Sequence, residues 1–147
     1  TYDGLVSKAV KIASNDPDSK ISTITFTATV WPFPRVLPKI IEVEWDAEAG
    51  GYTGTTRVVE LRNMGEKELR LKTIDQKGMA LDIEGEMDVV FEPGDARSYT
   101  IGIAKPEEIP VDTRPLRTFA ILRVELQTDK GRMVSSKNVK FRFPRKR

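Results

Sequence analysis

The stretch WPFPRVLP, residues 31–38, divides the chain into two unequal parts. It holds three of the nine prolines in the sequence. Each proline removes an amide donor and restricts the residue before it to extended conformations, which predicts a stiff connector. We assign residues 32–38 to this connector. Residues 1–31 before it are predicted to form a β-hairpin, and residues 39–147 after it to form a β-sandwich.

The segment before the connector shows the clearest strand pattern in the chain. Val10 and Ile12 alternate with polar residues, and the turn-forming sequence NDPDS follows at 15–19. From residue 23 to 30, four threonines alternate with four apolar side chains, which predicts a strand with one apolar and one polar face. A lone hairpin is marginal in water. We therefore expect its apolar face to dock on another surface.

The segment after the connector alternates in the same way, in short runs separated by turn signals. Residues 105–115 are expected to form a loop that bridges two sheets. No window of 11 residues has helical periodicity, so an immunoglobulin-like antiparallel β-sandwich of seven to eight strands is predicted. A small β-barrel is the alternative. The residues expected to point inward are Ile41, Val43, Trp45, Val59, Leu61, Leu69, Leu71, Met79, Leu81, Ile83, Tyr99, Ile101, Ile103, Ala120, Leu122, Val124, Leu126, Val139, Phe141 and Phe143.

The composition excludes several kinds of chemistry. The 147 residues include no cysteine and no histidine. Disulfides, Cys/His zinc sites, cysteine nucleophiles and Ser-His-Asp triads are therefore absent, as is the usual general base near neutral pH. The formal net charge of +2 does not indicate a polyanion-binding protein. No apolar run approaches the ~18 residues that a membrane-spanning helix needs, so membrane insertion is not expected.

The two ends of the chain resemble each other. The sequence VKIASND at 10–16 compares with VELQTD at 124–129, and ITF at 24–26 compares with VKF at 139–141. Any two β-hairpins share such alternation, so the repeat stays a hypothesis. If it holds, residues 1–31 are the last two strands of a preceding sandwich in a tandem array. The chain also begins at Thr1 in mid-pattern and without Met, so we expect an upstream segment.

Residues 36–143 resemble the immunoglobulin-like domains of the abnormal-spindle/hydin (ASH) type and their bacterial relatives of unknown function. The motifs that carry the resemblance are VLP at 36–38, VELRNMG at 59–65, FEPGD at 91–95, and the strand ends LQTD at 126–129 and SNDP at 14–17. One departure is the missing Phe-Gly of the first strand, where Trp45 lies nearby. The resemblance implies a sandwich module in protein-interaction roles, a bacterial periplasmic or extracellular location, and neither chemistry nor cofactor.

The basic end of the chain is the candidate binding site. It consists of Lys137, Lys140, Arg142, Arg145, Lys146 and Arg147. Lys140 and Arg142 alternate with Phe141 and Phe143, which places them on the solvated face of the last strand, where they would meet an acidic partner or phosphate. The competing interpretation is a solvated strand face, since edge strands often carry lysine. No aromatic stacking platform is recognisable, so specific nucleic-acid binding is not expected.

Three further groups are weaker candidates. Asp16 and Asp18 share a turn and would supply too few oxygens for Ca²⁺. Glu84, Glu86 and Asp88 are spaced as paired carboxylates for glycoside hydrolysis, although nothing in the sequence places them in a pocket. Trp31 and Phe33 are either an exposed recognition patch or the seal between hairpin and sandwich. For all three groups the structural interpretation is favoured.

These patterns predict a non-enzymatic immunoglobulin-like module, structural or protein-interacting, from a larger tandem-repeat protein. The alternative is an accessory domain of an enzyme whose catalytic part lies outside this chain. No cofactor and no metal are expected. The expected partner is a protein, bound by strand addition or through a sheet face. A homodimer or strand swap through the N-terminal hairpin would also cover its apolar surface.

Overall fold

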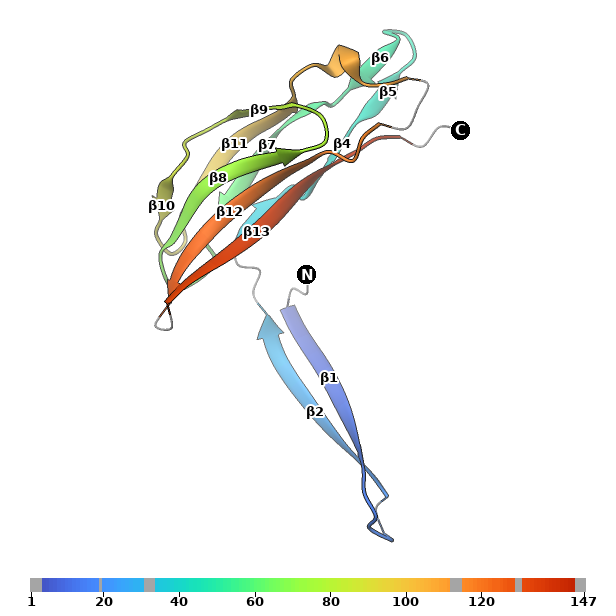
Figure 1. The fold of residues 1–147 in the computed structure, drawn as a ribbon, viewed down its shortest axis with the longest axis vertical. Helices are drawn as coiled ribbons and strands as arrows, with labels where there is room; N and C mark the ends of the chain where they lie inside the picture. The colour runs from blue at the N-terminus through green and yellow to red at the C-terminus, as the bar shows by residue number, and fades with distance from the viewer. Residues whose placement is uncertain (1–3, 19, 31–33, 112–114, 129–130, 145–147) are drawn as a thin grey trace. The chain divides into compact units, whose positions relative to one another are not determined.

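The structure is a computed structural model that describes residues 4–18, 20–30, 34–111, 115–128 and 131–144. It is all-β, as predicted. Apart from one short 3₁₀ turn, η1 (Pro106–Glu108), every regular element in those ranges is a strand. The chain forms two compact units, Thr1–Phe33 and Pro34–Arg147 (Figure 1).

The first unit is the predicted hairpin. β1 (Gly4–Ala13) pairs with β2 (Ile21–Val30) in an antiparallel register of ten pairs. The turn between them is closed by the Ser14 amide, which donates to the Lys20 carbonyl at 2.9 Å. Inside the turn the Asp18 amide donates to Asp16 Oδ1 at 2.9 Å. This is the local side-chain bond that makes aspartate a turn residue.

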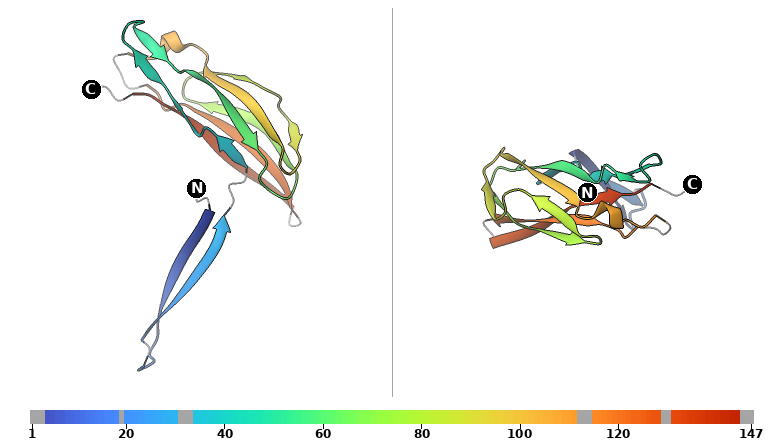
Figure 2. Two further views of the ribbon diagram at one scale, coloured as in Figure 1. Left: turned by 180° about the vertical axis from the view of Figure 1, so that it is seen from behind. Right: turned by 90° about the horizontal axis from the view of Figure 1, so that it is seen from above.

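The second unit is a sandwich of two main sheets, seen from behind and from above in Figure 2. One sheet has the strand order β10-β8-β12-β13-β4 and the other β3-β7-β11-β9, with a small sheet β5-β6 beside them. All pairs are antiparallel except β13 with β4. The strands are β3 (Arg35–Leu37), β4 (Ile40–Glu42), β5 (Glu44–Asp46), β6 (Gly51–Thr53), β7 (Thr56–Arg62), β8 (Leu69–Lys77), β9 (Leu81–Glu84), β10 (Val89–Phe91), β11 (Ala96–Ile103), β12 (Phe119–Thr128) and β13 (Gly131–Arg142).

The core is built from the inward positions of both main sheets. Most of the predicted inward residues are buried, because strand alternation places every second side chain between the layers. The partly buried ones are Met79, Leu81, Ile83, Leu126 and Phe143. Trp45 was predicted to lie in the core, and this is wrong, since it is 40% exposed. Its strand β5 pairs with β6 in the small sheet and is not part of the five-stranded sheet. The Trp45 ring packs edge-on against the Tyr52 ring, with centroids 5.1 Å apart.

The second unit begins earlier in the chain than the sequence pattern suggested. Residues 35–37 were assigned to the connector, but they form β3 and pair with β7. Val36 is 1% exposed, so it belongs to the core. The flanking prolines lie outside this short segment, so residues 35–37 keep their amide groups for pairing with β7. An edge strand also tolerates proline at its ends. Trp31 and Phe33 lie outside the described residues.

The sandwich also contains more strands than the predicted seven to eight. The additional strands are β3, β6 and β5, which is separate from β4 although Ile41, Val43 and Trp45 were predicted to share one strand. The chain passes from one main sheet to the other between β9, in the four-stranded sheet, and β10, in the five-stranded sheet. At that crossing Gly85 has φ +144°, and an added Cβ would lie 2.3 Å from the Tyr99 ring. Glycine is therefore required there by both the backbone and the packed ring.

Candidate interaction surface

The outer face of the five-stranded sheet brings together residues that are distant in sequence. The strand register aligns Lys77 of β8, Phe119 of β12, Lys140 of β13 and Ile40 of β4 in one row across the sheet. We call these four residues the cationic row. Their chain neighbours Ala120, Val139 and Ile41 point into the core, so alternation directs Phe119, Lys140 and Ile40 outward. Side chains directly opposite each other have Cβ atoms about 5 Å apart.

The acidic groups beside the cationic row are already paired with arginines. Arg123 Nε donates to Asp75 Oδ2, and this bond holds the pKa of the Asp75 carboxyl below its usual range. Arg142 Nη1 donates to Glu42 Oε1 at 2.6 Å. Lys77 and Lys140 have no acidic partner among the residues that the structure describes. The row therefore carries two uncompensated positive charges.

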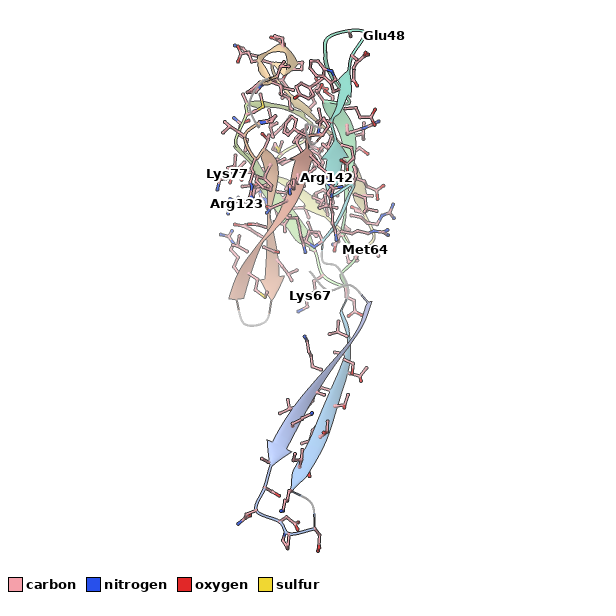
Figure 3. All side chains as sticks on the ribbon, turned by 90° about the vertical axis from the view of Figure 1, so that its right-hand side faces the viewer. Glu48, Met64, Lys67, Lys77, Arg123 and Arg142 are labelled. Carbon is pink, nitrogen blue, oxygen red and sulfur yellow. The ribbon has the colours of Figure 1, made fainter. Side chains whose placement is uncertain are left out.

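Figure 3 labels three side chains of this face, Lys77, Arg123 and Arg142. Lys77 and Arg123 project from the same side of the sandwich there. Ile121 lies between the row and Arg123, opposite Asp75 on β8 and Asn138 on β13. Phe119 and Ile121 are both partly exposed. The face thus has a small apolar centre with cationic groups at its border.

The structure separates the six basic residues predicted as a binding site. Lys140 and Arg142 lie on the outer face, and Arg142 is engaged by Glu42. Lys137 lies on the other face of β13, opposite the buried Leu122, and is half-buried. Arg145, Lys146 and Arg147 lie outside the described residues. Sequence reasoning missed Lys77 and Phe119 because only the strand register brings them beside Lys140.

The three carboxylates considered for catalysis do not line a strand face. Glu84 is the last residue of β9, and Glu86 and Asp88 lie in the crossing to β10. Glu86 pairs with Arg97 at 2.8 Å. Asp88 pairs with Lys72 at 3.2 Å and with Arg70 at 2.8 Å. Bonds from Lys72 first, and then from Arg70, lower the pKa of the Asp88 carboxyl, so these cations keep it ionised.

An open hollow of about 420 Å³ lies beside the β3 edge of the four-stranded sheet. Arg62 Nε donates to Glu60 Oε1 at 3.1 Å within this hollow. This bond, together with the charges of Arg62 and Arg35, lowers the pKa of the Glu60 carboxyl. Glu60 therefore offsets part of the positive charge of the two arginines there. The lining residues are Arg35, Leu37, Glu60, Arg62, Asn63, Met64, Gly65 and Gly94.

Within the described ranges, no cluster of three or more metal-ligating side chains occurs. Those ranges also contain no helix that is long and apolar enough to cross a membrane. Comparison of the chain with protein-family models, with curated proteins and with solved structures found no match.

Proposed function

We propose that this chain is a non-enzymatic immunoglobulin-like module that serves as a structural or protein-interaction unit in a larger, tandem-repeat protein. The strand order supports the immunoglobulin-like assignment. With β3, β7, β11 and β9 as strands A, B, E and D, the facing strands β8, β12 and β13 correspond to C, F and G. The ASH-type resemblance is part of the proposal. Its Asn-x-Gly motif ends β7, where Asn63 is fully buried and bonded to two turns.

The observation that carries the proposal is the exposed apolar face of the hairpin. The β1–β2 register places Val10 opposite Ile24, and Phe26 two residues further along the same face. Val10, Ile12, Ile24 and Phe26 are between 44% and 59% exposed. Thr23, Thr25 and Thr27 occupy the opposite face. Such a division of faces is typical of a strand pair with one side packed against another layer.

The sandwich itself contains a hairpin of similar size that is packed along most of one face. β12 and β13 also form ten antiparallel pairs, β8 pairs with β12 from Phe119 to Leu126, and β4 pairs with the last three residues of β13. The inward residues Ala120, Leu122, Val124, Val139 and Phe141 are 2% exposed or less. β1 and β2 therefore resemble a strand pair from within a sandwich. In the described part of the chain no further strand pairs with them.

The length of the edges indicates what would cover the hairpin. The sandwich of this chain ends in β10 and β4 on one sheet and in β3 and β9 on the other. These strands have three or four residues, whereas β1 and β2 have ten. The short strand β4 covers only residues 140–142 of β13, so residues 131–139 of that strand keep an open edge among the described pairings. The fitting occupant is a neighbouring β-sandwich with a long open edge, which the hairpin would complete.

This proposal predicts that the hairpin contributes nothing to the stability of the sandwich. Deleting residues 1–33 is expected to leave the free energy of unfolding of 34–147 within about 0.5 kcal/mol of the full chain. In the full chain, hairpin amides should exchange with solvent far faster than those of β12. Urea unfolding and hydrogen exchange measure the two quantities. Strongly protected hairpin amides, or loss of cooperative unfolding after the deletion, would show that the hairpin is integral to this fold.

A further inference from the structure

We propose that the outer face of the five-stranded sheet binds an extended acidic segment of a partner protein. In this complex two carboxylates approach Lys77 and Lys140, and an apolar side chain of the segment packs on Phe119 between them. The inference rests on the proposed function only in taking the partner to be a protein. The hairpin experiments do not test it, so either proposal can fail without the other.

The charges on this face favour an acidic partner. The carboxylates of Asp75 and Glu42 are bound by Arg123 and Arg142. The two lysines are left uncompensated among the described residues. Arg117 lies at the same end of the sheet, because its carbonyl oxygen approaches Gly78, the residue after Lys77. Opposite charge on a partner would steer it to this end of the sheet and fix its register.

The apolar residues distinguish a protein segment from a plain polyanion. Ile40 is 36% exposed at one end of the row, and the partly exposed Phe119 lies between the lysines. Adjacent strands are about 4.8 Å apart, so the backbones at Lys77 and Lys140 are separated by about 9.6 Å. In a polyproline II segment, side chains three residues apart share a side at about 9.3 Å. Acidic residues at every third position would therefore meet both lysines.

The test uses the full chain and a short synthetic peptide that repeats Glu-Pro-Leu. Titration followed by NMR should shift the resonances of Phe119, Lys77 and Lys140. Raising the salt concentration should weaken the binding, since the contacts are exposed to solvent. A peptide that repeats Lys-Pro-Leu should not bind. Absence of any shift with the glutamate peptide, or equal binding of the lysine peptide, would overturn the proposal.

Charge reversal on the row supplies the matched comparison. The double variant Lys77→Glu and Lys140→Glu should bind the glutamate peptide at least about tenfold more weakly. The control is Lys11→Glu with Lys20→Glu, which makes the same change of net charge on exposed residues of the hairpin. It should bind as the unmodified chain does, and thermal unfolding checks that both variants are folded. Equal losses in the two double variants, or equally tight binding of inorganic polyphosphate by the unmodified chain, would refute a specific acidic-peptide surface.

Discussion

Asn63 connects two turns at one end of the sandwich. Its side-chain amide donates to the Lys67 carbonyl at 2.9 Å and to the Phe91 carbonyl at 3.0 Å. Its Oδ1 accepts the Gly65 amide at 3.0 Å, which closes an Asx turn. Its main chain also bonds to Gly94 and Asp95. One buried side chain thus holds the β7–β8 turn against the β10–β11 turn.

Replacing this side chain should therefore be costly. Asn63→Ala is expected to lower the free energy of unfolding by about 2–4 kcal/mol, because buried carbonyls lose their donors. Asn63→Asp should destabilise at least as much at neutral pH, since a carboxylate oxygen would face two carbonyls. Part of that loss should be recovered at acidic pH, when the carboxyl is protonated. Urea unfolding measures the stability of both variants. The control is Asn138→Ala, at an exposed asparagine. A loss for Asn63→Ala no greater than the control's would contradict this role.

Tyr99 should make stability depend on alkaline pH. Burial raises the pKa of Tyr99 to about 12, and its hydroxyl donates to the Glu86 carbonyl at 2.9 Å. The phenol ionises near pH 10 in the unfolded chain, so the folded state holds the proton more tightly. Its contribution is therefore complete below about pH 10 and is lost as pH rises through about 12. The loss is up to about 2 kcal/mol.

Urea unfolding between pH 9 and pH 12 would measure this effect as the difference between the unmodified chain and Tyr99→Phe. The variant should be less stable by about 1 kcal/mol at neutral pH, because it lacks the hydrogen bond. The difference should shrink and then change sign as the solution becomes alkaline, since the loss at Tyr99 is larger than about 1 kcal/mol. Parallel stability curves for the two proteins would show that Tyr99 is not the titrating group.

At the scale of elements, the hairpin is the exceptional part of the chain. Its strands rise about 3.3 Å per residue and lie about 4.8 Å apart, so ten paired residues make a face of roughly 33 by 10 Å. Two such faces packed together bury less than the ~1,200 Å² of a stable interface. A homodimer formed only through the hairpins is therefore expected to be weak. This small area favours a neighbouring domain that both pairs with an edge of the hairpin and covers its apolar face.

The two faces of the hairpin should respond differently to an introduced charge. At high concentration the chain is expected to self-associate weakly through the apolar face, where Phe26 is 59% exposed. Phe26→Asp should abolish this association, because a carboxylate would have to be desolvated. Thr25→Asp, one residue away on the polar face, should leave it unchanged. Sedimentation equilibrium measures the association.

Two results would contradict this interpretation of the hairpin. A dimer that persists at low concentration would identify the hairpin as a dimerisation element of this chain. An equal response to Phe26→Asp and Thr25→Asp would show that the apolar face is not the associating surface.

At the scale of the whole molecule, two units of different character lie in one chain. The sandwich has its own core, drawn from both main sheets. The hairpin has paired backbones but no covered apolar face in the described residues. Deletion of residues 1–33 tests this division directly. The cationic row lies within the sandwich, so peptide binding should survive that deletion.

The all-β class and most of the core were predictable because strand alternation is local. Ile41, Leu61 and Leu122 each lie in a short alternating run whose inward face can be recognised without knowing its partner. The hairpin turn was predictable for a similar reason, since Asp16 bonds within its own turn. The strand order, the β3 segment and the position of Trp45 were not predictable. They depend on which sheet a short segment joins.

The strand-forming segments, their turns and the two faces of the hairpin follow from neighbouring residues along the chain, so the amino-acid sequence alone specifies them. The candidate surface depends on the tertiary structure. Lys77, Phe119 and Lys140 belong to three strands, and hydrogen-bond register alone aligns them. The same register separates Lys137 from Lys140, since an odd number of residues along a strand reverses the face. Which charges remain unpaired was decided by the arginines that the fold places beside Asp75 and Glu42.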